Sequence, residues 1–341
     1  MPTIYYDGAA VELAEDESVL DALLRHGHEV VYSCRSGACQ SCLMRCTKGR
    51  LDESSQRALK PTLRERGYFL PCVATPSEDL HVTGSAAEDV SIEAAVARIE
   101  PLSSNVFRLL LEPAEPFAHR PGQFLNLVRP ADGLVRSYSI ASVPGWDAPI
   151  SRDGSADSEL LELHVRLVAD GRMSGWIARQ AKPGDTVYLR GPGGECFYTE
   201  EDPDQPMLLA GTGTGLAPLW GIARDALARG HRGPIALYHG AIDARGFYLV
   251  QELRVLAEAH PNLTYRRCVL RNDGIGEASD DLRVGPIDQQ ISRSPGDLAG
   301  WRVFLCGDPE LVHRMRKKAF LAGASMSQIY ADAFLTSSSP D

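Results

Sequence analysis

Three cysteines fall within nine residues near the N-terminus, in the stretch CRSGACQSC. They are Cys34, Cys39 and Cys42, and a fourth, Cys72, follows in the segment FLPC. The spacing C-x4-C-x2-C with one distant cysteine is typical of [2Fe–2S] sites, in which four thiolates surround two irons and two bridging sulfides. The sequence therefore predicts an iron–sulfur cluster held by these four residues, with Gly37 letting the backbone approach the inorganic sulfides.

Two other interpretations of these cysteines compete. Zinc sites usually pair two C-x2-C motifs, and this segment holds only one such pair. A single buried cysteine is often an inert thiol, but this does not explain a set at this spacing. Cys46 could replace Cys42 as a ligand; we expect it instead to be a buried residue of the strand that follows the loop.

The tetrapeptide Arg136-Ser-Tyr138-Ser139 combines side chains suited to a flat, charged cofactor. A guanidinium can bind a phosphate, an aromatic ring can lie on a heterocycle, and a hydroxyl can reach a ring nitrogen. The pattern alone is weak, because ordinary strands also contain such residues.

A second pattern, Gly171-Arg-Met173-Ser174, precedes a helix that we expect over residues 175–181. Ser174 is a natural N-cap, and the free N–H groups of a helix N-terminus form an anion site suited to a pyrophosphate. The alternative is a capped helix that binds nothing.

A glycine turn joins an apolar strand at 207–210 to a helix that we expect over residues 219–228. Its motif residues are Gly211, Thr212, Gly213 and Gly215. The turn departs from G-x-G-x-x-G at Leu216, so it indicates only a phosphate or dinucleotide near a helix N-terminus. A purely structural turn is the alternative.

These patterns fall into three segments. Residues 1–85 read as a small α+β unit, with a hairpin turn at Asp7-Gly8 and a helix capped by Ser18 and ended by Gly27. Residues 78–95 are polar and suit a linker.

The middle of the chain has short alternating strands that predict an antiparallel β-barrel. They lie at 106–111, 123–128, 137–141, 161–168 and 186–190. From residue 203, apolar strands alternate with helices in the pattern of a doubly wound α/β unit. His164 and His239 fall in strands and are expected to be structural.

Composition narrows the classes of function. The chain has 341 residues, 44% hydrophobic and 23% charged, which suits a globular protein of two or three domains. A formal net charge of −10 disfavours a nucleic-acid partner, which needs a basic face. We see no apolar run of 18 residues and no secretory signal, so we expect no membrane insertion and a cytoplasmic location. There, eight cysteines favour metal binding over disulfides.

The first 85 residues resemble a plant-type ferredoxin domain with a β-grasp fold. RSYS followed by GRMS on a barrel resembles the FAD domain of the ferredoxin–NAD(P)H reductase family. The resemblance implies that Arg136 holds the FAD pyrophosphate, Tyr138 packs on the isoalloxazine and Ser139 lies near the reactive flavin nitrogen. The helix start would contribute Gly171, Met173 and Ser174. Some relatives use FMN, with the domains in another order, so we expect FAD.

The glycine turn matches the pyridine-nucleotide turn of the same family. The segment Cys306-Gly307-Asp308-Pro309 also matches, and implies that the Cys306 thiol faces nicotinamide and lets it approach the flavin without acting as a nucleophile. Phe334, otherwise an ordinary apolar residue of a last strand, would stack on the flavin face that nicotinamide must occupy. Ser139, Cys306 and Phe334 would therefore lie at the reacting atoms.

The choice between NADH and NADPH depends on residues after the second strand of the α/β unit. Asp243 disfavours a 2′-phosphate there, whereas Arg245 leaves NADPH open. Phe247, Tyr248 and Glu252 resemble the NADH-using branch of the family, so we expect NADH.

The resemblance as a whole implies a reductase component of a multicomponent oxygenase. It would comprise a ferredoxin domain (1–88), an FAD-binding β-barrel (92–201) and an NAD(P)-binding α/β domain (203–341), and would act as a monomer. Electrons would pass from NADH through FAD and [2Fe–2S] to a terminal oxygenase or another electron-acceptor protein, such as a separate ferredoxin or a deoxysugar dehydratase. Two alternatives stay open: a redox-sensing module, and a docking domain whose cluster is only structural.

Overall fold

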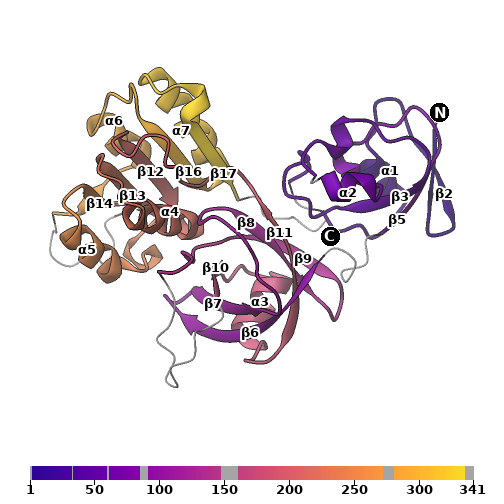
Figure 1. Cartoon of the computed structure of the whole chain (residues 1–341), viewed down its shortest axis with the longest axis horizontal. Helices are drawn as coiled ribbons and strands as arrows, with labels where there is room; N and C mark the ends of the chain where they lie inside the picture. The colour runs from indigo at the N-terminus through magenta and orange to yellow at the C-terminus, as the bar shows by residue number, and fades with distance from the viewer. Residues whose placement is uncertain are drawn as a thin grey trace.

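Three units follow one another along the chain, each built around its own sheet (Figure 1). The computed structural model describes residues 2–32, 34–59, 61–84, 91–146, 160–271 and 280–334. Figure 1 shows the N-terminal unit in indigo and the C-terminal unit in orange to yellow on different sides of the middle unit. Hydrogen bonds join the middle unit to both of the others, from Asn126 to Cys39 and from Ser139 to Asp332.

The N-terminal unit is a mixed five-stranded sheet with short helices. The strands are β1 (Thr3–Tyr6), β2 (Ala9–Glu12), β3 (Met44–Lys48), β4 (Tyr68–Phe69) and β5 (Leu80–Gly84). The helices are α1 (Val19–Arg25), α2 (Pro61–Glu65) and the 3-10 turns η1 (Ser54–Gln56) and η2 (Pro71–Val73). The sheet order is β2-β1-β5-β3-β4, with β1 and β5 parallel and the other neighbours antiparallel. This mixed sheet and its packed helix confirm the β-grasp expectation.

Local signals place the first elements where the sequence predicted them. Asp7 and Gly8 both have positive φ, at 46° and 85°, as a primed hairpin turn requires. The backbone N–H of Asp21 donates to Ser18 Oγ over 3.1 Å, which caps α1. Gly27 follows the helix with φ of 80°.

The middle unit is an antiparallel barrel. Its strands are β6 (Ile92–Pro101), β7 (Val106–Pro113), β8 (Phe124–Arg129), β9 (Leu134–Ser139), β10 (Leu161–Arg166) and β11 (Thr186–Gly193). Their order is β10-β7-β6-β11-β8-β9, and a bridge between Ile140 and Leu163 connects the two edges. The helix α3 (Arg172–Arg179) packs Met173 and Ile177 into the barrel core.

Two expectations about this region were wrong in detail. Residues 78–95 are not simply a linker, because β5 ends the first sheet and β6 begins the barrel; residues 85–90 lie outside the described part. Leu80 and Val82 are both buried, but two alternating apolar residues next to an acidic segment are too few to predict a strand.

The start of α3 also differs from the expectation. Ser174 is not an N-cap: α3 begins earlier, with Gly171 at that position, and Ser174 Oγ accepts from the Val168 N–H over 3.2 Å.

The C-terminal unit is a parallel sheet with helices on both faces. Its strands are β12 (Met207–Thr212), β13 (Ile235–Ala241), β14 (Leu263–Val269), β15 (Leu282–Val284), β16 (Arg302–Gly307) and β17 (Ile329–Ala333). Its helices are α4 (Leu216–Ala228), α5 (Val250–Ala259), α6 (Ile287–Arg293) and α7 (Pro309–Leu321), with the 3-10 turns η4 (Gly213–Gly215), η5 (Ala244–Gly246) and η6 (Met326–Gln328). The helix expected from residue 219 starts at Leu216, because Pro218 is tolerated in a first turn.

The order of this sheet, β15-β14-β13-β12-β16-β17, confirms the doubly wound pattern. Side chains of α4 and α5 join one core cluster, and those of α6 and α7 join another, so the helices cover opposite faces. The strand order reverses between β12 and β16, which is where such sheets bind ligands, beyond the carboxyl ends of the strands. Both predicted nucleotide motifs follow these two strands.

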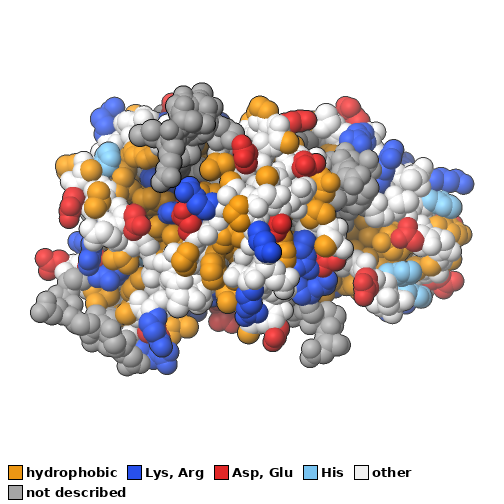
Figure 2. Space-filling view, turned by 90° about the horizontal axis from the view of Figure 1, so that it is seen from below, with side chains coloured by type: hydrophobic (Ala, Val, Ile, Leu, Met, Phe, Trp, Pro, Cys, Tyr) orange, Lys and Arg blue, Asp and Glu red, His pale blue; other side chains and the backbone are white. Residues whose placement is uncertain are grey.

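The surface carries charges of both signs. On the face in Figure 2, basic and acidic side chains are interspersed with apolar ones. Within the described part of the chain, no helix has the length and apolar character needed to cross a bilayer.

Candidate functional site

One cavity of about 650 Å³ gathers residues from all three units. The cysteine loop contributes Cys34, Ser36, Ala38 and Cys39; the barrel contributes Phe124, Arg136, Ser137, Tyr138, Ser139, Gly171, Met173 and Ser174; and the C-terminal unit contributes Thr214, Ala217, Asp332 and Phe334. Residues predicted separately as cluster ligands, cofactor contacts and a stacking ring therefore line one space.

The four predicted cluster ligands form two neighbouring pairs. The N–H of Cys34 donates to Cys39 Sγ over 3.4 Å, and the N–H of Cys39 donates to Cys34 Sγ over 3.3 Å. A hydrogen bond from Cys39 lowers the pKa of the Cys34 thiol to about 4, and one from Cys42 lowers the pKa of Cys72. In the described ranges, no three His, Cys, Asp or Glu side chains lie in an arrangement that could hold a single metal ion. Within each pair one thiol donates to the other sulfur, which raises the pKa of Cys39 and of Cys42. Two adjacent cysteine pairs suit a two-iron cluster, one pair for each iron.

The loop between these cysteines turns its backbone N–H groups toward the sulfurs. Arg35, Gly37 and Gln40 all have positive φ, and the N–H of Ser36 donates to Cys34 Sγ over 3.4 Å. Successive N–H groups in such turns stabilise anionic sulfur. Cys46 lies apart on β3, as expected, but is half-buried rather than buried.

The RSYS residues lie on β9, at the barrel side of the cavity. Arg136 is half-buried, and burial lowers the pKa of its guanidinium. A partly desolvated cation is stabilised by a bound anion such as a pyrophosphate, so Arg136 is suited to its expected role. Burial raises the pKa of Tyr138, which keeps its ring neutral beside the cavity.

The start of α3 presents free N–H groups to the same cavity. Gly171 is its N-cap and has no side chain to satisfy them. A Cβ there would lie 2.4 Å from Ser174 Oγ, so glycine is required by the tight turn. Met173 packs in the barrel core and the Ser174 hydroxyl contacts Val168, so these two residues face the cofactor site mainly through their backbone.

The glycine turn and the segment after β16 meet at the reversal point of the C-terminal sheet. A Cβ on Gly215 would lie 2.3 Å from the Cys306 carbonyl oxygen, and one on Gly307 would lie 2.7 Å from that of Thr212. The close approach of the two strand ends therefore requires these glycines. The N–H of Asp308 donates to Thr212 Oγ1 over 3.2 Å.

Asp308 and Pro309 also have local roles. The carboxylate of Asp308 accepts from the N–H of Leu311 over 2.9 Å and so caps α7, whose first residue is Pro309. This contact engages the Asp308 side chain within its own helix.

Cys306 is fully buried at the end of β16. Burial raises the pKa of its thiol well above the ordinary value, so it is a neutral thiol and not a nucleophile at physiological pH. Its Sγ lies 3.6 Å from Cys196 Sγ, in the segment that follows β11. The thiol therefore lies where the barrel meets the C-terminal unit.

Asp332 belongs to the site and was missed at the sequence level. It pairs with Cys306 in the β16–β17 register and accepts a hydrogen bond from Ser139 Oγ over 3.2 Å. Burial raises the pKa of its carboxyl to about 6. Phe334, two residues later, lines the same cavity, and its N–H donates to the Gly307 carbonyl over 2.8 Å. The alternation of a β-strand could have identified Asp332, because it lies two residues before Phe334 and residues i and i+2 share a face.

Comparison with known proteins identifies the family of this chain. Residues 4–77 match the 2Fe-2S iron-sulfur cluster binding domain, 93–198 the oxidoreductase FAD-binding domain and 209–317 the oxidoreductase NAD-binding domain. The ferredoxin–NAD(P)+ reductase component of a Pseudomonas putida naphthalene 1,2-dioxygenase system is 30% identical over 93% of each chain. The reductase subunit of an Amycolatopsis aromatic O-demethylase is 33% identical, over 97% of this chain and 98% of the relative. The chain belongs to this family of ferredoxin–NAD(P)+ reductase components.

A solved structure shows the same architecture. The Amycolatopsis cytochrome P450 reductase GcoB superposes with a TM-score of 0.65 at 31% identity, covering 98% of this chain and 99% of that one. The protein is thus an oxidoreductase with a ferredoxin domain, an FAD domain and an NAD domain in that order, and [2Fe–2S], FAD and NAD are its cofactors.

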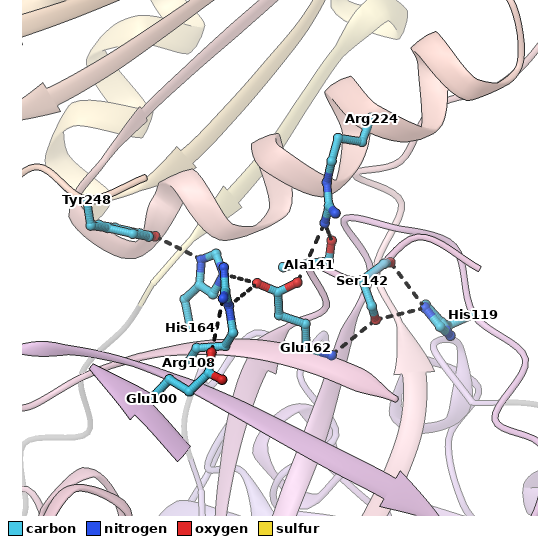
Figure 3. Close-up of polar contacts among 9 residues, drawn as sticks. All are labelled: Glu100, Arg108, His119, Ala141, Ser142, Glu162, His164, Arg224 and Tyr248. Carbon is cyan, nitrogen blue, oxygen red and sulfur yellow. Dashed lines mark hydrogen bonds and ion pairs between the residues drawn. The ribbon is translucent and has the colours of Figure 1, made fainter. Parts of the chain in front are cut away.

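A buried polar network joins the FAD and NAD domains of this reductase (Figure 3). Glu162 Oε1 accepts from Arg108 Nε and contacts His164 Nε2, each over 2.8 Å. Arg224 of α4 lies 3.7 Å from Glu162 Oε2, and Tyr248 contacts His164 Nδ1 over 3.1 Å. His164 thus takes part in a buried network, while it also lines the cavity, so its structural role stays a prediction.

Proposed function

We propose that this reductase takes electrons from NADH and passes them through FAD and the [2Fe–2S] cluster to the terminal component of a multicomponent oxygenase. The observation that carries the proposal is the single cavity shared by Cys34 and Cys39, the RSYS strand and Phe334. Relatives over nearly the full chain are named as reductase components of dioxygenase, monooxygenase and demethylase systems. That the protein is a cytoplasmic monomer remains a prediction from its sequence.

The residues divide between holding the cofactors and shaping the space between them. NADH supplies a hydride, FAD can accept two electrons and release them singly, and the cluster carries one at a time. Arg136 and the start of α3 would bind the FAD pyrophosphate, and the four cysteines would hold the cluster. Phe334 would cover the flavin face until nicotinamide displaces it.

Ser139, Asp332 and Cys306 would line the place where nicotinamide meets FAD. The uncharged thiol of Cys306 is compact and lets a ring approach closely. The Ser139 hydroxyl is held by its hydrogen bond to Asp332, so its orientation is set by the protein. The domain limits 1–88, 92–201 and 203–341 are part of this proposal.

The proposal of NADH over NADPH rests on an acidic residue after β13. Asp243 lies just beyond the strand, where acidic side chains of dinucleotide-binding folds accept from the ribose 2′-hydroxyl. Its hydrogen bond with Arg245 lowers the pKa of its carboxyl, so it stays ionised and could accept from a ribose 2′-hydroxyl. Arg245 and Arg271 lie 2.9 and 3.8 Å from this carboxylate, so the charge here does not itself exclude a 2′-phosphate. Phe247 and Tyr248 are buried in the core, and so contribute to packing.

Replacing one cluster ligand tests the relay. In Cys72→Ser, NADH-dependent reduction of ferricyanide, which accepts electrons from flavin, should continue, while reduction of cytochrome c through the cluster should be abolished. Equal loss of both activities in a protein that retains FAD would contradict the proposal. Cys46→Ser is the matched control, since that thiol lies outside the proposed ligand set, and it should keep both activities.

A further inference from the structure

Asn126 connects the cysteine loop to the FAD domain. Its side chain is 2% exposed and projects from β8. Its amide nitrogen Nδ2 donates to the carbonyl of Cys39 over 2.8 Å. Its Oδ1 accepts from Ser137 Oγ over 2.7 Å and from Ser41 Oγ over 3.3 Å. One side chain thus contacts both the loop that carries the proposed cluster ligands and the strand that carries RSYS.

The orientation of this amide follows from its partners. A carbonyl oxygen can only accept, so Nδ2 must face Cys39, while the hydroxyls of Ser41 and Ser137 can donate to Oδ1. Asn126 lies opposite Ser137 in the β8–β9 ladder and opposite Arg190 in the β8–β11 ladder. The backbone beneath the amide is therefore fixed by a strand on each side.

The contact between Asn126 and the cysteine loop is buried, so its polar groups must find their hydrogen-bond partners within the protein. Ser41 is 3% exposed, so neither its hydroxyl nor the Asn126 amide has water as an alternative partner. A buried polar group without a partner is unfavourable, so the loop and the barrel are held together by groups that satisfy each other. Of the two contacted loop residues, Cys39 is itself a proposed ligand and Ser41 lies next to another, Cys42.

We propose that Asn126 is a positioning residue for electron transfer from FAD to the cluster. It would hold the peptide of Cys39 at a fixed distance from β9 and so set the separation of the two cofactors. This inference rests on the proposed function. The amide contacts a backbone carbonyl and no sulfur in the described contacts, and cluster potentials respond to hydrogen bonds at sulfur. Its loss should therefore change the transfer rate and leave the cluster potential unaltered.

The test compares Asn126→Leu, Ser41→Ala and Ser142→Ala in the holoprotein. Asn126→Leu removes all three contacts at similar volume. Ser41→Ala removes the longer one, together with the contacts of the Ser41 hydroxyl to Ser137 Oγ and to the Cys39 side chain. Ser142 is the control because its hydroxyl is buried in the same barrel but accepts from the Glu162 N–H, away from the loop. Hydrogen–deuterium exchange of the peptide covering residues 34–46 reports loop release without turnover. Anaerobic stopped-flow with NADH separates FAD reduction from cluster reduction, and an EPR-monitored titration gives the cluster potential.

The proposal expects faster exchange in Asn126→Leu, an unchanged potential and unchanged FAD reduction. Cluster reduction should be slower by about tenfold or more, because small misplacements of reacting groups cost large factors in rate. Ser41→Ala should show a smaller increase in exchange and a smaller loss of cluster-reduction rate, which keeps the test available if Asn126→Leu does not fold. The unchanged potential is expected of Asn126→Leu alone, because the Ser41 hydroxyl also contacts the Cys39 side chain. Ser142→Ala should match the wild type.

Several outcomes would overturn the proposal. Unchanged exchange in both loop variants would show that Asn126 does not hold the loop. Loosened exchange with an unaltered cluster-reduction rate would show that holding the loop does not control transfer. Loss of FAD from Asn126→Leu would assign the residue to barrel stability. A wild-type cluster that NADH never reduces would contradict the proposed function instead, while the exchange result would still report on the contact itself.

Discussion

Ser139 of the FAD domain donates a hydrogen bond to the carboxylate of Asp332 in the NAD domain, over 3.2 Å. Asp332 lies on β17, and its register partner on β16 is Cys306. This contact therefore connects residues proposed to meet flavin and nicotinamide. It also places an ionisable group beside the site where negative charge would accumulate on reduction.

Replacing Asp332 with asparagine should remove a pH dependence. Burial raises the pKa of Asp332 to about 6, so the carboxylate is ionised above that pH and opposes added negative charge nearby. NADH-dependent ferricyanide reduction should fall as the pH rises through about 6 in the wild type. In Asp332→Asn this inflection should be absent, and the rate should match the wild-type limit at low pH. An inflection that persists in the variant would assign the titration to another group.

The same shift predicts a change in stability. The folded-state pKa of Asp332 lies above its ordinary value of 3.8, so the native state binds this proton more tightly than the unfolded state does. The stability contribution of this group should therefore rise as the pH falls from about 6 toward 3.8. At pH 8, Asp332→Asn should melt at a higher temperature than the wild type, measured by flavin fluorescence.

Glu162→Gln should destabilise the junction between the FAD and NAD domains. Burial alone would raise the pKa of Glu162, but His164, Arg108 and Arg224 together lower it to about 2. Removing one partner of a buried charge network costs about 3–5 kcal/mol. We expect a loss of this size in thermal or urea unfolding at pH 7.

Glu100→Gln is the control for that prediction. Glu100 also contacts Arg108, but its side chain is 33% exposed, and exposed pairs contribute about 0–1 kcal/mol. Because the pKa of Glu162 is lowered, its contribution is complete above about 4.5 and is lost only as the pH falls toward about 2. The difference between wild type and Glu162→Gln should therefore be undiminished at pH 5; a difference that vanishes there would contradict the network.

Arg136→Ala should deplete FAD. Charge-assisted hydrogen bonds contribute about 1.5–3 kcal/mol, which corresponds to roughly 10–100-fold weaker binding. Absorbance of the purified variant should show less flavin per cluster, and added FAD should restore activity. Full retention of FAD would refute the assigned role. Arg232→Ala is a suitable control, because that guanidinium is exposed, pairs with Asp204 in the NAD domain and does not line the cavity.

The sequence predicted those features that depend on short spacings. The cysteine loop, the capped helix after Ser18 and the Asp7-Gly8 turn each use residues a few positions apart, and the strand–helix alternation of the NAD domain has its own period. The start of α3 was misjudged because Ser174 has good capping chemistry, whereas packing of Met173 extends the helix back to Gly171.

Contacts between the domains could not be predicted from the local patterns of a single sequence. Asn126 meets Cys39 across 87 positions and Asp332 meets Ser139 across 193, and neither residue belongs to a recognisable motif. The network around Glu162 likewise draws on strands of the barrel and on α4. Such contacts depend on how finished domains pack, which local patterns do not encode.

An anaerobic titration of the purified protein with NADH, and separately with NADPH, tests the electron relay most directly. We predict that NADH bleaches the flavin absorbance and then produces the EPR signal of a reduced [2Fe–2S] cluster, and that NADPH does so less effectively. Flavin bleaching with no cluster signal would break the relay between FAD and the ferredoxin domain. No response to either nucleotide would contradict the account of this protein as a pyridine-nucleotide-dependent reductase.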